Sequence, residues 1–269
     1  MSADPIRVAA FYRFAQVGEP ETLAAWLREA GRALDIKGSI IVASEGANGT
    51  IAGAPDAVAA LLDSLRGEPG FEGLTPRLHD APAVPFLRWK VKVKREIVTL
   101  GVPVDAAGGA GAHVAPADWN ALIADPDTVI IDTRNDYEVA IGSFAGAIDP
   151  RTASFGDFPA WFDAQAETWR AEGRRPRIAM FCTGGIRCEK STAYARARGF
   201  DEVYHLKGGI LAYLAEIEAT DSLWRGECFL FDERVSITHG EALGDARLCP
   251  DCGQPILADD HDCTSAQGE

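Results

Sequence analysis

The feature that most constrains the fold is a cysteine placed directly after a short apolar run. Residues Arg177–Phe181 have the composition of a buried strand, and Cys182 stands at its carboxyl end. A glycine-rich turn, Arg187 and a helix predicted over Ser191–Ala197 follow. This order is typical of an α/β domain with a mainly parallel sheet, whose functional sites lie at the carboxyl ends of the strands. Cys182 therefore lies where such a domain carries its chemistry.

The loop after Cys182 is suited to hold an anion. It consists of Thr183, Gly184, Gly185, Ile186 and Arg187. Backbone amides of the turn and the start of the helix would point into the loop, and Arg187 adds a positive charge. A thiolate is then favoured over a thiol, which makes Cys182 a candidate nucleophile. The alternative is a buried cysteine before an ordinary strand–helix turn, and the glycines and the arginine together favour the nucleophile.

The residues before this domain predict a separate fold over residues 1–104. Strands are expected at Ile6–Phe14, Arg77–His79 and Trp89–Leu100, helices at Pro20–Leu34 and Pro55–Arg66, and a hairpin over Gly38–Ala52. The hairpin is expected to turn at Glu45–Gly49, because Asn48-Gly49 tolerates positive φ. The order βαββαβ predicts a ferredoxin-like sandwich of helices on an antiparallel sheet.

The rest of the chain divides into three parts. Residues 105–115 are rich in glycine and alanine and are expected to be a linker. Residues 116–220 alternate strands and helices, with strands expected at Thr128–Asp132, Arg177–Phe181 and Glu202–His205 and helices at Ser191–Ala197 and Ile210–Ile217. Residues 221–269 form a short irregular tail that contains cysteines. The predicted architecture is thus an α+β domain followed by an α/β domain and a tail.

Composition and charge exclude several classes of protein. Apolar residues make up 47% and charged residues 25%, which is the balance of a globular protein. No apolar run can span a bilayer and no export signal is visible at the N-terminus, so we expect a cytoplasmic protein. Its six cysteines are then more often catalytic or metal-binding than paired in disulfides. A net charge of −14 repels nucleic acid, so binding to it requires a local basic patch.

A candidate for that patch is a run of basic residues on the strand predicted at Trp89–Leu100. It contains Arg88, Lys90, Lys92, Lys94 and Arg95. Since strand side chains alternate faces, Arg88 and the three lysines would share one face, with the lysines ~6.5–7 Å apart, close to the spacing of phosphates. The alternative is a solvated lysine face that protects a sheet edge from aggregation.

Several stretches together resemble a known family. Four of them resemble a rhodanese domain: Ile131–Arg134, Gly142–Ile148, Cys182–Arg187 and His205–Ile210. Over nearly the whole chain, Ser44–Gly53, Lys90–Val98 and Phe181–Lys190 resemble the bacterial tRNA uridine hydroxylase family TrhO, also called YceA. The resemblance implies a tRNA substrate, molecular oxygen as co-substrate and 5-hydroxyuridine at the wobble position as product. It also favours RNA contact for the basic strand.

The resemblance further implies roles for residues around the loop. The reactive, persulfide-type cysteine of the family falls on Cys182. Cys188 either resolves a persulfide or sulfenate on Cys182 by forming a disulfide, or is a small buried residue of the helix. Asp132 and Arg134 are expected to form a buried salt bridge that braces the loop.

The tail carries half of a possible zinc site. Cys249-Pro-Asp-Cys252 has the spacing that places two thiolates on one ion, and His261 and Cys263 are the nearest further ligands. The resembling family usually carries a second Cys-x-x-Cys pair in its tail, whereas this chain has His-Asp-Cys. A zinc site and a set of free thiols both remain open.

No sequence motif accounts for the activation of oxygen. There is no Gly-x-Gly-x-x-Gly fingerprint after a strand and no haem-attachment motif, so no flavin, haem or electron donor is indicated. His239-Gly-Glu241 has the His-x-carboxylate form of a non-haem iron site, but such a match often arises by chance. No feature indicates the oligomeric state.

Two other functions compete with a tRNA hydroxylase. One is a sulfurtransferase that moves sulfane sulfur to a small acceptor or to tRNA. The other is a regulatory rhodanese module that only binds partners, which an intact Cys182 argues against.

Overall fold

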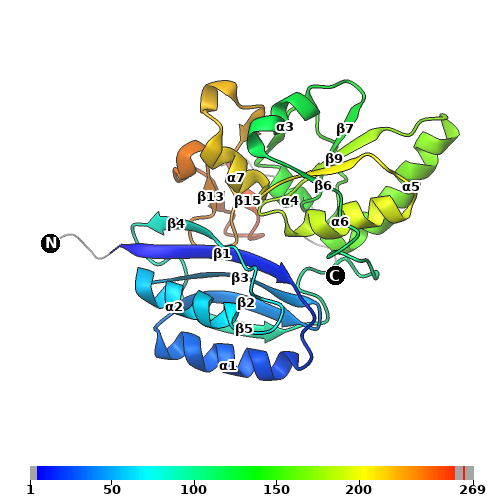
Figure 1. The fold of residues 1–269 in the computed structure, drawn as a ribbon. Helices are drawn as coiled ribbons and strands as arrows, with labels where there is room; N and C mark the ends of the chain where they lie inside the picture. The colour runs from blue at the N-terminus through cyan, green and yellow to red at the C-terminus, as the bar shows by residue number, and fades with distance from the viewer. Residues whose placement is uncertain (1–4, 258–262, 264–269) are drawn as a thin grey trace. The chain divides into compact units, whose positions relative to one another are not determined.

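The structure, a computed structural model, describes residues 5–257 and 263. The chain divides into two units, Met1–Thr99 and Leu100–Glu269, each with its own sheet (Figure 1). The boundaries expected at residues 104, 115 and 220 stay predictions. Among the described residues, no helix has both the length and the apolar character needed to cross a bilayer.

The first unit is a five-stranded sheet with two helices. Its elements are β1 (Ile6–Phe14), α1 (Pro20–Ala33), β2 (Lys37–Ala43), β3 (Gly46–Gly53), α2 (Pro55–Arg66), β4 (Arg77–Ala81) and β5 (Trp89–Val93). The strand order is β4-β1-β3-β2-β5. The ferredoxin-like βαββαβ arrangement is confirmed. The sheet is antiparallel except at one edge, where the added strand β5 runs parallel to β2.

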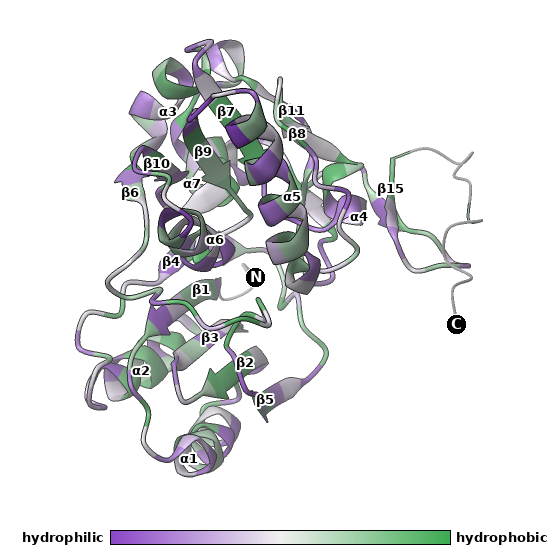
Figure 2. Cartoon of the chain, turned by 90° about the vertical axis from the view of Figure 1, so that its right-hand side faces the viewer, coloured by the Kyte–Doolittle hydropathy of each residue, from purple (hydrophilic) through white to green (hydrophobic). Residues whose placement is uncertain are grey.

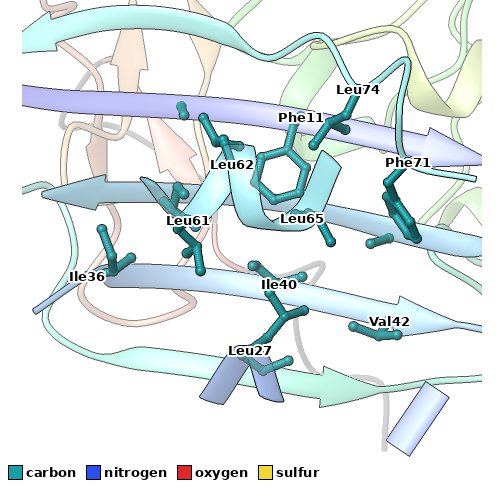
Figure 3. Packing of buried hydrophobic residues seen from close by; sticks show 14 of the residues in the cluster. Phe11, Leu27, Ile36, Ile40, Val42, Leu61, Leu62, Leu65, Phe71 and Leu74 are labelled. Atoms are coloured by element: carbon teal, nitrogen blue, oxygen red, sulfur yellow. The ribbon is translucent and has the colours of Figure 1, made fainter. Parts of the chain in front are cut away.

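The two helices of this unit begin where the sequence predicts and bury one apolar stripe each. Both have a proline in the first turn, whose fixed φ and missing N–H suit that position. Leu27 of α1 and Leu61 and Leu65 of α2 pack with Phe11 and Ile40 of the sheet (Figure 3). Burying each such side chain stabilises the fold by roughly 1.5–3 kcal/mol.

The hairpin turns earlier than predicted, and this also shortens β5. The turn is Ser44-Glu45, and Asn48 lies inside β3, opposite Ile41. The Asn48 side-chain amide donates to the carbonyl of Ile97 (3.1 Å), and the Glu45 carboxylate accepts from the amide of Ile97 (2.7 Å). The amide and the carbonyl of Ile97 are thus hydrogen-bonded to side chains and do not pair with a neighbouring strand. Strand β5 therefore ends at Val93 instead of reaching Leu100.

The second unit contains a four-stranded parallel sheet with the order β6-β10-β9-β7. Its elements are β6 (Ala112–Val114), α3 (Pro116–Ile123), β7 (Thr128–Asp132), α4 (Asp136–Val139), β8 (Gly142–Phe144), α5 (Phe158–Ala171), β9 (Arg177–Phe181), α6 (Ile186–Ala197), β10 (Val203–Leu206) and α7 (Gly209–Glu216), with the short 3-10 turns Phe155–Asp157 and Ala219–Asp221. Strands β7 and β9 are mostly hydrophobic (Figure 2). The predicted mainly parallel α/β domain is confirmed.

Three features of this unit differ in detail from expectation. The edge strand β6 lies inside the stretch expected to be a linker. Helix α6 begins at Ile186 rather than at Ser191, because Gly185 adopts a positive φ of 97° and caps it directly. The tail contains short strands, and its first part enters the core: Trp224, Cys228, Leu230 and Ile237 are buried there. These strands are β11 (Trp224–Gly226), β12 (Cys228–Phe229), β13 (Ser236–Ile237), β14 (Arg247–Leu248) and β15 (Pro255–Ile256).

Candidate active site

Cys182 lies at the carboxyl end of β9, in the loop that leads into α6. The loop is so tight that the amide of Gly185 donates a hydrogen bond back to Cys182 Sγ, at 3.1 Å. Gly185 itself has a positive φ of 97°, a conformation that costs glycine little. The loop thus directs a donor at the sulfur, as the sequence predicts.

The start of α7 holds the other side of the loop. The amides of Ile210 and Leu211 donate to the carbonyls of Cys182 (3.0 Å) and Thr183 (3.1 Å). Gly209 lies so close that a Cβ there would be 2.5 Å from both carbonyl oxygens. The loop's carbonyls are therefore fixed away from the sulfur, and the amides are left to face it.

Cys182 and Cys188 interact directly, and the interaction shifts their pKa values in opposite directions. A hydrogen bond joins their side chains, and Thr133 Oγ1 lies 3.7 Å from Cys188 Sγ. Burial raises the pKa of Cys182, but the Cys188 thiol, the Arg187 charge and backbone amides outweigh burial and lower the pKa to about 6. Burial and the adjacent Cys182 thiolate raise the pKa of Cys188 well above its usual range. Cys182 thus carries the negative charge and Cys188 keeps the proton.

We expect Cys182 to titrate near pH 6 instead of near an ordinary cysteine pKa of about 8.5. The thiolate, and with it the nucleophilic fraction, is lost as the pH falls through this value. The difference in far-ultraviolet thiolate absorbance between the wild type and Cys182→Ser, followed against pH, measures the transition. A midpoint at or above that of free cysteine would contradict the assigned charge.

The positive charge of Arg187 is held by a carboxylate that sequence reasoning missed. Its guanidinium donates to Glu138 at 2.6 and 2.8 Å, and to Thr183 Oγ1 at 3.2 Å. The Glu138 side chain is 0% exposed. Burial raises the pKa of Glu138, but Arg187 outweighs this and holds it below its usual value. Arg187 therefore ties the loop to α4, and its charge reaches Cys182 only partly neutralised.

Asp132 and Arg134 form the buried ion pair that was expected. Arg134 Nη2 lies 2.7 Å from Asp132 Oδ2, and both side chains are 0% exposed. Ser143 also donates to Asp132 (2.8 Å), and Arg134 donates to the carbonyl of Glu138. The pair thus links the end of β7 to α4 and β8, and its role in bracing the loop stays a prediction.

Five basic residues of the first unit form an exposed row on and beside the edge strand β5. Lys90 and Lys92 lie within β5 and are exposed, while Val91 between them is buried in the helix-facing core. Arg88, Lys94 and Arg95 flank the strand and are also exposed. Because β5 is at the edge of the sheet, the structure is compatible with both RNA contact and edge protection.

Three tail cysteines converge, although one expected ligand lies outside the described residues. The thiol sulfurs of Cys249, Cys252 and Cys263 lie within 4.8 Å of one another, with Cys249 and Cys263 3.5 Å apart. The hairpin of β14 and β15 frames Cys249 and Cys252. His261, the expected fourth ligand, is outside the described part of the chain. His239, in the 3-10 turn His239–Glu241, belongs to neither group of three potential ligands found among the described residues.

If the tail binds zinc, the purified protein should contain about one equivalent, which Cys249→Ser/Cys252→Ser should lose. Removing the ion should loosen the tail, because metal binding and local folding are coupled. Persulfide formation on Cys182 should remain. Metal analysis together with that assay checks the expectation, and protein without zinc would leave free thiols.

The fold and the site define a protein with a rhodanese-like domain whose tight loop holds a buried cysteine. Residues 115–216 match the rhodanese-like domain family, and residues 6–97 match the family described as UPF0176 acylphosphatase like domain. A tRNA uridine(34) hydroxylase of Mesorhizobium japonicum is 55% identical, over 95% of this chain and 82% of that protein. One of Gluconobacter oxydans is 53% identical, over 94% of this chain and 81% of that protein. The chain belongs to the tRNA uridine(34) hydroxylase family.

Proposed function

We propose that this protein hydroxylates carbon 5 of uridine 34 in tRNA, with molecular oxygen as co-substrate and Cys182 as the reactive nucleophile. The observation that carries the proposal is the similarity to relatives named tRNA uridine(34) hydroxylase, which extends over 95% of the chain and includes both units. The reaction places one oxygen atom in the base and the other in water, and it takes two electrons and two protons from a reductant.

The geometry of the loop supports a reactive role for Cys182. Its sulfur is a thiolate at neutral pH, held by the Gly185 amide and beside a protonated Cys188. When Cys182 has become a sulfenic acid or a persulfide, the Cys188 sulfur is placed to attack Cys182 Sγ. The new disulfide bond replaces the S–OH or S–SH bond, and water or hydrogen sulfide leaves. We infer that an external thiol then reduces this disulfide by two electrons and is itself oxidised to a disulfide, which returns Cys182 to its thiolate form between turnovers.

The test of the function is the tRNA itself. Nucleosides from tRNA of cells with and without this protein are compared by mass spectrometry. The proposal expects 5-hydroxyuridine, and nucleosides formed from it, to disappear with the protein and to return when the wild-type chain is supplied. Unchanged 5-hydroxyuridine in cells that lack the protein and its relatives would overturn the proposal.

The basic row on β5 separates a tRNA enzyme from a sulfurtransferase that acts on small molecules. Replacing Lys90, Lys92 and Lys94 by glutamine removes three exposed charges and keeps the apolar face of the strand. If each lysine contacts one phosphate, the salt slope of tRNA binding should fall by about 2–3 units, and affinity at physiological salt by ~10-fold or more. Binding at several salt concentrations measures both.

Two controls accompany this measurement. The matched variant Arg151→Gln/Arg174→Gln/Arg175→Gln removes three exposed charges elsewhere and should leave the slope nearly unchanged. Transfer of sulfur from thiosulfate to Cys182, which releases sulfite, needs only the loop and should be unaffected in both variants. An unchanged slope in the lysine variant would mean that the row only protects the sheet edge.

A further inference from the structure

Three side chains of metal-binding type meet on one face of the parallel sheet. His113 in β6 and His205 in β10 are direct partners on neighbouring parallel strands, so both rings project to the same face. Their ring centroids are 4.1 Å apart. Glu189 of α6 reaches the same place, and one ligand atom from each of the three residues lies within 4.8 Å of the others. Two strands and a helix thus bring together residues that are far apart in the sequence.

The distances suit a single ion. His113 Nε2 lies 3.0 Å from Glu189 Oε1, and His205 Nε2 lies 3.9 Å from Glu189 Oε2. Nitrogen and oxygen ligands bound at about 2.0–2.2 Å and at right angles to each other are about 3 Å apart. The first pair has this separation already, and the second needs a shift of about 1 Å.

The ion pair between Glu189 and His113 does not explain why the His205 side chain is buried beside them. Its side chain is 1% exposed, and within the described part of the chain Nε2 has no partner within hydrogen-bond distance. Buried polar groups are normally hydrogen-bonded, and leaving one unsatisfied is costly. An ion between Glu189 and His205 would satisfy Nε2. The His113 side chain is 47% exposed, so coordination positions on its side would be open to solvent or to a small molecule.

We infer that His113, Glu189 and His205 form a binding site for one ferrous iron ion. Two histidines and one carboxylate with open positions are the ligand set of non-haem iron oxygenases. The thiolates of the tail, in contrast, suit zinc. The inference stands on ligand geometry and does not depend on the tRNA substrate. Glu189 directly follows Cys188, so the site adjoins the reactive loop.

The test measures iron binding in the full chain. Cys249→Ser/Cys252→Ser serves as the background, so that tail thiolates do not compete. The metal-free protein is mixed with ferrous iron under anaerobic conditions, and bound iron is counted after gel filtration. We expect about one equivalent. Addition of nitric oxide should then give the electron paramagnetic resonance signal of a high-spin ferrous nitrosyl centre, a readout that a merely structural ion pair would not give.

Variants assign the iron to these residues. His113→Ala should fold normally, because that side chain is half exposed, and should weaken iron binding at least ~10-fold; Glu189→Gln should do the same. His239→Ala, at a histidine outside the cluster, should bind iron like its parent. No bound iron, equal binding by His113→Ala, or binding of zinc with none of iron would each overturn the inference. Because the readout is iron and not modified tRNA, failure here is distinct from failure of the proposed hydroxylation.

Discussion

Cys182→Ser should abolish formation of 5-hydroxyuridine, with little loss of stability. Serine has almost the same shape, but its hydroxyl stays protonated at neutral pH, whereas the Cys182 thiol has a pKa of about 6. The reactive anion would therefore be absent while the loop keeps its hydrogen bonds to α7. The measurement is 5-hydroxyuridine formed on tRNA by the purified variant, beside its thermal unfolding curve.

The matched control for this variant is Cys228→Ser. Cys228 is also fully buried in the second unit, but burial raises its pKa to about 12, so it is an inert thiol. We expect Cys228→Ser to retain hydroxylation to the extent that it folds. Wild-type levels of 5-hydroxyuridine from Cys182→Ser would show that Cys182 is not catalytic and would remove the central element of the proposed function.

Glu138→Ala should destabilise the second unit by about 3–5 kcal/mol. The substitution leaves the buried Arg187 guanidinium without its two short hydrogen bonds to the carboxylate. The desolvation free energy of the unpaired guanidinium then opposes folding. Arg187 could regain contact with water only by moving, which would open the loop. Urea unfolding measures the loss, and the pKa of Cys182 in this variant reports whether the loop has kept its geometry.

An exposed ion pair in the same unit provides the comparison. Glu172 and Arg174 lie 3.2 Å apart with about half of each side chain exposed. Glu172→Ala should therefore cost at most about 1 kcal/mol, since solvent screens such pairs. A loss of similar size for Glu138→Ala would mean that water reaches Arg187, and the description of a dry ion pair beneath the loop would be wrong.

Local sequence patterns predicted those parts of the fold that depend on neighbouring residues. Strand β9 has the predicted bounds, and α1 and α2 begin at the predicted prolines. The prediction of a turn at Asn48-Gly49 was wrong because a contact with a distant part of the chain determines the conformation there: the Asn48 side chain donates a hydrogen bond to the carbonyl of Ile97, 49 residues away. Gly49 serves close packing of strands, since a Cβ there would lie 2.7 Å from the carbonyl of Ser39.

In the candidate site, too, the sequence predicts what neighbouring residues determine and not what distant contacts determine. The cysteine, glycines and arginine of the loop are contiguous, so their pattern was visible. Glu138 is 49 residues from Arg187, and its only sequence signal was that of a helix-capping residue after Asn135. His113 and His205 become neighbours through the register of β6 and β10, which no short motif encodes. The fold therefore had to be known before the Glu138–Arg187 ion pair or the His113–His205 pair could be recognised.

The position of β6 has a practical consequence for studying the second unit alone. The match to the rhodanese-like family begins at residue 115, directly after this strand. A fragment cut at that point would leave the outer side of β10 without the partner that pairs with it from Ala112 to Val114. The unpaired backbone groups of β10 could then form hydrogen bonds with the same strand of a second molecule, so we expect the fragment to self-associate. The excision point belongs before Gly111, whose amide is anchored to Thr192 of α6.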